Sequence, residues 1–79
     1  MNIRWLYCGE AGYWHSNEGR FDIAPGGFRH GVTPDFFELR DGLAKPEKRN
    51  TKHDTVAAAK SEALNVAIRD AKFAGALHL

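Results

Sequence analysis

The sequence predicts an α+β fold: a three- or four-stranded antiparallel sheet with one C-terminal helix packed on one face. Short apolar/polar alternations separated by turn residues fill the first half of the chain, and one long amphipathic run closes it. The connections between strands are too short for crossovers, so the sheet must be antiparallel. With 79 residues we expect a single domain, 1–79, comprising strands (1–44), a basic connection (45–53) and a helix (54–75).

Four segments are predicted to form strands. They are residues 3–8, 13–16, 20–24 and 36–40. The turn between the second and third is the clearest in the chain, because Asn17 and Gly19 both tolerate the positive φ of a tight hairpin. Residues 25–34 form a glycine-rich loop bounded by prolines, which Phe28 and Val32 are expected to hold in place.

Alternation also assigns side chains to the two faces of the sheet. In the third strand Phe21 and Ile23 share one face, and Arg20 and Asp22 share the other. In the last strand the predicted core residues are Phe37 and Leu39, and the outward residues are Glu38 and Arg40.

The run from Thr55 to Phe73 is rich in strong helix formers. At 100° per residue its small residues fall along one line, namely Val56, Ala59, Ala63, Ala67, Ala71 and Ala74. An alanine stripe lets the helix approach a flat sheet closely. Thr51 and Asp54 resemble a capping box, Asp54 could itself be the N-cap, and Gly75 is a plausible C-terminal stop.

Charge and cysteine content limit the class of protein. The net charge is only +1, and all of the excess positive charge lies in residues 45–53, which hold four basic residues and one acidic residue. The one cysteine, Cys8, cannot form an internal disulfide, and no apolar run is long enough to cross a membrane. We therefore expect a cytoplasmic protein without membrane contact.

Catalysis is not expected. No histidine is placed beside Cys8 by the sequence. Asp22 and Glu38 are outward acids, which are normally solvated and often pair with basic neighbours such as Arg20 and Arg40. A zinc site is not expected either, since Cys8, His15, His30, His53 and His78 show no ligand spacing. The sequence thus predicts no enzyme, no metal and no cofactor.

The aromatic residues outnumber those that one helix can cover. We expect some of them to remain on the open face of the sheet or in the 25–34 loop, where exposed aromatics with arginine favour a partner-binding surface. The predicted surface consists of Trp14, Phe28, Arg29, His30 and Phe36. Local packing or a homodimer seam is the other interpretation of the same residues.

The basic connection is the second candidate site. Its cations are Lys45, Lys48, Arg49 and Lys52. They are interpreted either as a solvated loop or as phosphate contacts just before a helix N-terminus.

The motif pattern resembles a group of small phage and prophage proteins that end in an alanine-lysine helix. The matching pieces are Trp5, Trp14, residues 17–23 and 39–42, and Ala59-Lys60. Small phage proteins of this build include anti-CRISPR proteins, which bind a host nuclease complex without catalysis. A weaker resemblance, carried by Lys52, Ala59-Lys60 and Ala63-Leu64, is to the double-stranded RNA-binding domain, whose first helix and lysine pair are missing here.

The first resemblance implies a non-catalytic inhibitor, encoded by a phage or mobile element, that occludes a surface of a host nucleic-acid-targeting complex in the bacterial cytoplasm. Its partner would be a host protein or nucleoprotein complex, and the inhibitor itself would be a monomer or homodimer. The alternative is a direct nucleic-acid-binding module that uses the basic connection.

Overall fold

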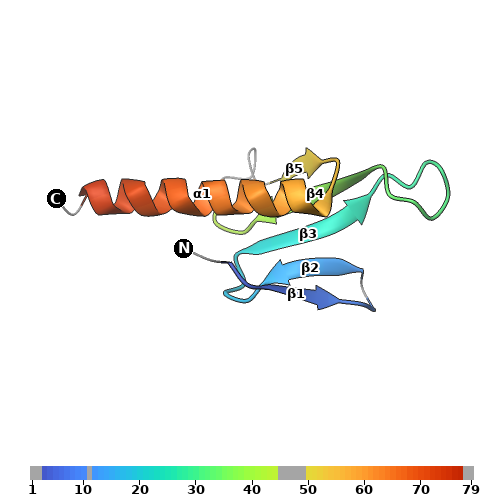
Figure 1. Ribbon diagram of the computed structural model, residues 1–79, viewed down its shortest axis with the longest axis horizontal. Helices are drawn as coiled ribbons and strands as arrows, with labels where there is room; N and C mark the ends of the chain where they lie inside the picture. The colour runs from blue at the N-terminus through green and yellow to red at the C-terminus, as the bar shows by residue number, and fades with distance from the viewer. Residues whose placement is uncertain (1–2, 11, 45–49, 78–79) are drawn as a thin grey trace.

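The structure is a computed structural model that describes residues 3–10, 12–44 and 50–77, with side chains as far as residue 71. Five strands form one antiparallel sheet in chain order, and a helix lies across it (Figure 1). The elements are β1 (Trp5–Cys8), β2 (Tyr13–Ser16), β3 (Phe21–Gly26), β4 (Phe36–Asp41), β5 (Asn50–His53) and α1 (Val56–Leu77). The α+β prediction is confirmed, with one strand more than expected.

The core lies between α1 and the middle of the sheet. Phe21 and Ile23 of β3 and Leu39 of β4 are buried against Ala59 and Ala63 of α1. Ile23 and Leu39 are direct cross-strand partners, so they present one continuous apolar surface to the helix. The predicted faces of β3 and β4 are therefore correct for these residues. The other side of the sheet, here called the open face, is not covered by the one helix that the structure describes (Figure 1).

The β2–β3 hairpin turns where the sequence predicted. Gly19 has a φ of 83° and donates its N–H to the Ser16 carbonyl at 3.0 Å. The buried Ser16 hydroxyl accepts from the Phe21 N–H at 2.9 Å and donates to the Phe21 carbonyl at 3.3 Å. These bonds fix the hairpin register and hence the direction in which Phe21 enters the core.

β5 replaces part of the predicted basic connection. Asn50–His53 pairs with β4, with Lys52 opposite Glu38. The strand was missed because its four residues are all polar and show no alternation. An edge strand is held by backbone hydrogen bonds to one neighbour and can stay polar, and lysine at such an edge opposes pairing with other chains.

The helix begins later and ends later than predicted. Thr55 is the N-cap, since its hydroxyl accepts from the Ala58 N–H at 3.0 Å. The predicted cap Asp54 and the capping box are therefore wrong, because Thr51 belongs to β5 and bonds the His53 ring at 2.8 Å. The helix also continues past Gly75 to Leu77. No helix in the described part of the chain has the length and apolarity needed to span a bilayer.

Arg20 does not face outward with Asp22 as predicted. It precedes β3, and its guanidinium donates to both oxygens of Asp41, at 2.9 and 3.0 Å, and to Asp70 of α1. The hydrogen bond to Asp41 is the main cause of a raised pKa for Arg20, with Asp70 adding to it against the opposing effect of burial. Arg20 thus joins the end of β4 to the helix.

Candidate binding surface

The β3–β4 connection projects from the end of the sheet as a finger, defined here as residues 27–35 (Figure 1). At its base the Asp35 N–H donates to the Gly26 carbonyl at 2.9 Å. Near its tip His30 and Thr33 form an antiparallel bridge. Gly31, between them, has a φ of 91°, which suits the first position of a tight type II′ turn.

Side chains add to the order of the finger. The Arg29 Nε donates to Asp35 Oδ2 at 2.8 Å across the two arms. Gly27 has a φ of 90°, and a Cβ there would lie 2.6 Å from Asp35, so the base requires glycine. Phe28 is held at a φ of 52°, in the left-handed region that bulky residues rarely adopt. Such backbone strain is most common at functional sites.

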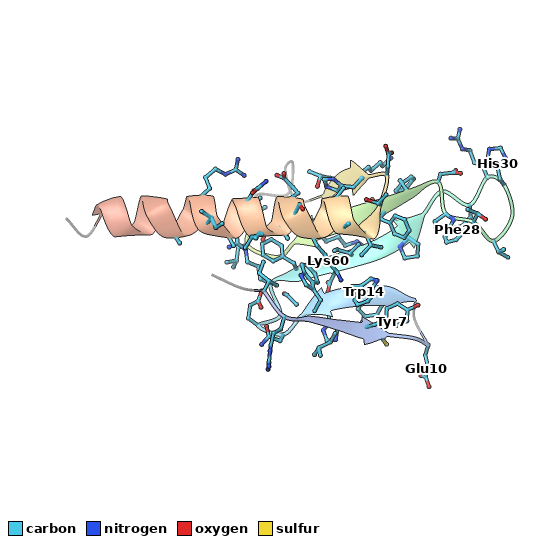
Figure 2. All side chains as sticks on the ribbon, in the orientation of Figure 1. Tyr7, Glu10, Trp14, Phe28, His30 and Lys60 are labelled. Atoms are coloured by element: carbon cyan, nitrogen blue, oxygen red, sulfur yellow. The ribbon has the colours of Figure 1, made fainter. Side chains whose placement is uncertain are left out.

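The tip of the finger is apolar and uncovered. Val32 is 94% exposed, so the expectation that it would hold the loop against the domain is wrong. The Arg29 side chain is 80% exposed even though it is paired with Asp35, and His30 is exposed beside it. Figure 2 shows Phe28 at the base of the finger and His30 toward its tip. The finger therefore presents an apolar tip flanked by basic side chains.

The open face carries a row of polar residues across four strands. The register places His15 opposite Asp22, Asp22 opposite Arg40, and Arg40 opposite Asn50. Arg40 donates its Nε to Glu38 Oε1 at 3.1 Å, as the sequence suggested for this pair. Asp22 has no such bond to any residue that the structure describes.

A hollow of about 530 Å³ lies where the open face meets the finger. It is lined by Tyr13, Asp22, Ala24, Pro25, Phe28 and Arg40. Only Phe28 of this set was a predicted site residue. The outward positions of Asp22 and Arg40 were readable from alternation, but their approach to Tyr13 and Phe28 depends on strand register and on the bend of the finger, which no sequence signal specified.

Trp14 is not on the open face. It lies opposite the core residue Ile23, half-buried on the helix side of the sheet. The Tyr7 ring lies 4.7 Å from its ring, and the Lys60 ammonium of α1 lies 3.9 Å from its centroid (Figure 2). Contacts with Tyr7 and Lys60 make Trp14 part of the packing at the edge of the helix, so it does not belong to the candidate surface.

Phe36 does lie on the open face, as predicted. It packs against Gly26, where an added Cβ would lie 2.6 Å from the Phe36 ring. The Lys52 ammonium of β5 lies 4.6 Å from the centre of the same ring. Lys52 is thus engaged with an aromatic face. The other predicted phosphate contacts, Lys45, Lys48 and Arg49, lie outside the described residues.

Among the described residues no three histidine, cysteine or acidic side chains gather as metal ligands. Cys8 and Tyr13 are cross-strand partners, and His15 points its ring toward Tyr13 at a centroid distance of 5.8 Å. The described arrangement can offer charge, aromatic surface and an apolar tip to a partner.

The chain matches no protein-family model, and comparison with curated proteins and with solved structures gave no match. The two sequence resemblances therefore stay predictions.

Proposed function

We propose that this protein is a non-catalytic binding module that docks onto a protein partner through the finger and the adjoining open face. The observation that carries the proposal is the combination of internal order and an exposed apolar tip. Val32 is 94% exposed although the bonds below it fix the direction of the finger. A loop that is already ordered loses little conformational entropy on binding, which favours insertion of its tip into a pocket.

The resemblance to small phage proteins supports a narrower version. We take the partner to be a host complex that targets nucleic acid, such as a CRISPR effector in the bacterial cytoplasm. The activity is then occlusion of a protein or DNA-binding surface of that complex. The partner's identity is supported by the resemblance alone, and the docking mode is supported by the finger.

The proposal is tested with purified protein and a panel of purified CRISPR effector complexes, measured for binding and for cleavage of a matched DNA target. We expect at least one effector to be bound and inhibited. The change Val32→Asp places a charge at the inserted tip and should weaken binding by about thirtyfold, the size of an interface hot spot. Leu43 is the matched control, because it is 77% exposed in a different turn, and Leu43→Asp should leave binding unchanged.

Two results would count against the proposal. If Val32→Asp and Leu43→Asp weakened effector binding equally, the finger would have no special role in docking. Direct binding to a nucleic-acid duplex of about 20 base pairs, falling steeply between about 50 and 200 mM salt, would favour the nucleic-acid alternative. That binding should be lost in Lys48→Gln and Arg49→Gln, whereas docking through the finger should be indifferent to them.

A further inference from the structure

Asp22 lies on the open face and has no charge partner among the residues that the structure describes. Its neighbours across the strands are His15 and Arg40, yet Asp22 makes no hydrogen bond or ion pair with any residue the structure describes. The residue is half-buried. Removing part of the water from a carboxylate is unfavourable unless another group replaces the lost interactions. A cation supplied from outside the chain would do so.

The neighbouring charged groups are already engaged elsewhere. Arg40 also lines the hollow, but its Nε donates to Glu38, and the Glu38 carboxylate offsets the positive charge of the guanidinium. The Lys52 ammonium, on the next strand, lies over the Phe36 ring and outside the lining of the hollow. Of the three described side chains Asp22, Glu38 and Arg40, two are acidic and one is basic, so together they carry a net negative charge.

The walls of the hollow suit a flat cation. Tyr13 of β2 and Phe28 of the finger both line it, and Ala24 of β3 adds only a methyl group to the lining. A guanidinium group can lie against an aromatic ring and at the same time donate two parallel hydrogen bonds to one carboxylate. The ammonium of lysine cannot make the paired donation. The volume of about 530 Å³ is within the range of small-ligand sites.

We infer that this hollow binds the guanidinium group of an arginine side chain, with Asp22 as the anion and Tyr13 and Phe28 as stacking surfaces. The inference deepens the proposed function and rests on it, because the partner protein supplies the arginine. Phe28 belongs to both the finger and the lining of the hollow, so its strained backbone would fix the direction of the finger and the position of the ring in the hollow.

The test uses the isolated protein and small probes, without any partner. N-acetyl-arginine methylamide is titrated while the ring resonances of Tyr13 and Phe28 are followed by NMR. We expect saturable shifts with a dissociation constant on the order of 1 mM, as suits so small a ligand. The corresponding glutamine and glutamate probes should bind at least about tenfold more weakly, because they lack the positive charge.

Variants identify the group responsible. Asp22→Asn should weaken the arginine probe at least about tenfold. It should leave the melting temperature nearly unchanged, since Asp22 has no described partner to lose. Glu18→Gln removes the same charge from an exposed turn away from the hollow and should leave binding intact. Equal affinity for the glutamine probe, or glutamate binding that disappears in Arg40→Gln, would overturn the inference.

The two proposals fail separately. If the arginine probe does not bind while Val32→Asp still disrupts an effector complex, the hollow is not an arginine site and the docking mode stands. If the probe binds in an Asp22-dependent way and no protein partner responds to Val32→Asp, the site stands and the proposed function falls.

Discussion

Arg20 bonds two carboxylates that differ in exposure. Its side chain is 16% exposed, and it makes a two-point contact with the buried Asp41 and a further contact with Asp70 of α1, which is 56% exposed. Asp41 also accepts from the Leu43 N–H at 3.0 Å, so it organises the turn after β4 as well. Both carboxylates favour the charged form of the guanidinium, and the raised pKa of Arg20 reflects this stabilisation.

Loss of the buried carboxylate should be costly. Asp41→Asn keeps the shape but removes the negative charge opposite Arg20, leaving a largely buried guanidinium without its main partner. We expect the free energy of unfolding to fall by about 2–3 kcal/mol, as for the loss of one member of a mostly buried pair. Urea denaturation followed by tryptophan fluorescence measures the change.

Asp70 provides the matched control. Asp70→Asn removes the exposed partner of the same guanidinium, and the expected cost is about 0–1 kcal/mol because solvent screens the contact. If Asp70→Asn cost as much stability as Asp41→Asn, Arg20 would act mainly by holding the helix. The Arg20–Asp41 pair at the end of β4 would then not be the main stabilising contact.

At the scale of elements, the contact between α1 and the sheet depends on alanine. Ala59 and Ala63 are completely buried against β3 and β4, and small side chains allow the helix backbone to approach the strands. Ala63→Leu adds three carbon atoms where no space is left. We expect it to lower the free energy of unfolding by about 1–3 kcal/mol through overpacking. Thermal and urea denaturation measure it.

Ala57 is exposed on the same helix and is the control position. Ala57→Leu should change stability by less than about 0.5 kcal/mol, since leucine is nearly as good a helix former as alanine. If Ala63→Leu were equally well tolerated, the helix would have room to move away from the sheet, and close packing would not be what orients it.

The elements that the sequence predicted are those whose burial pattern is visible in their residue types. Alternation identified Phe21, Ile23 and Leu39 as core, and the alanine line identified the buried stripe of α1. β5 has no such pattern in its residue types, because Asn50–His53 is held at the sheet edge by its backbone. Helix limits were also missed, since Thr51 and Thr55 are chemically equivalent caps and only tertiary pairing decides between them.

The candidate surface was predicted in part for the same reason. Phe28, Arg29 and His30 were identified because an aromatic and basic cluster in a glycine-rich loop is visible in the sequence. The hollow was not, because Tyr13 and Asp22 come from different strands and meet through register. Trp14 was misplaced because every residue of β2 is polar or aromatic, so alternation did not say which side faces the helix.

At the scale of the whole molecule, the protein is elongated. Its radius of gyration is 13.8 Å, compared with roughly 12 Å for a compact domain of this length. The finger extends from one end of the sheet, and α1 extends past the other end (Figure 1). α1 packs on β3, β4 and β5, and Ala71, beyond the last core contact, is exposed. The helix is therefore supported by the sheet over its first turns.

This shape predicts a gradient of amide hydrogen exchange along α1. Amides between Ala59 and Val66 should be as protected as those of β3 and β4, because both open only on global unfolding. Protection should fall after Asp70, because α1 extends past the end of the sheet toward its C-terminus and can fray locally there (Figure 1). Exchange measured by NMR residue by residue tests the prediction.

Dilution separates fraying from self-association. A projecting amphipathic end could be covered by a second copy, and the exchange would then be slow up to Leu77 in concentrated samples and faster after tenfold dilution. Exchange that is fast beyond Asp70 at every concentration would assign the gradient to a monomer. Uniform, concentration-independent protection along the whole helix would contradict it, because turns without a sheet beneath them have no other means of resisting local opening.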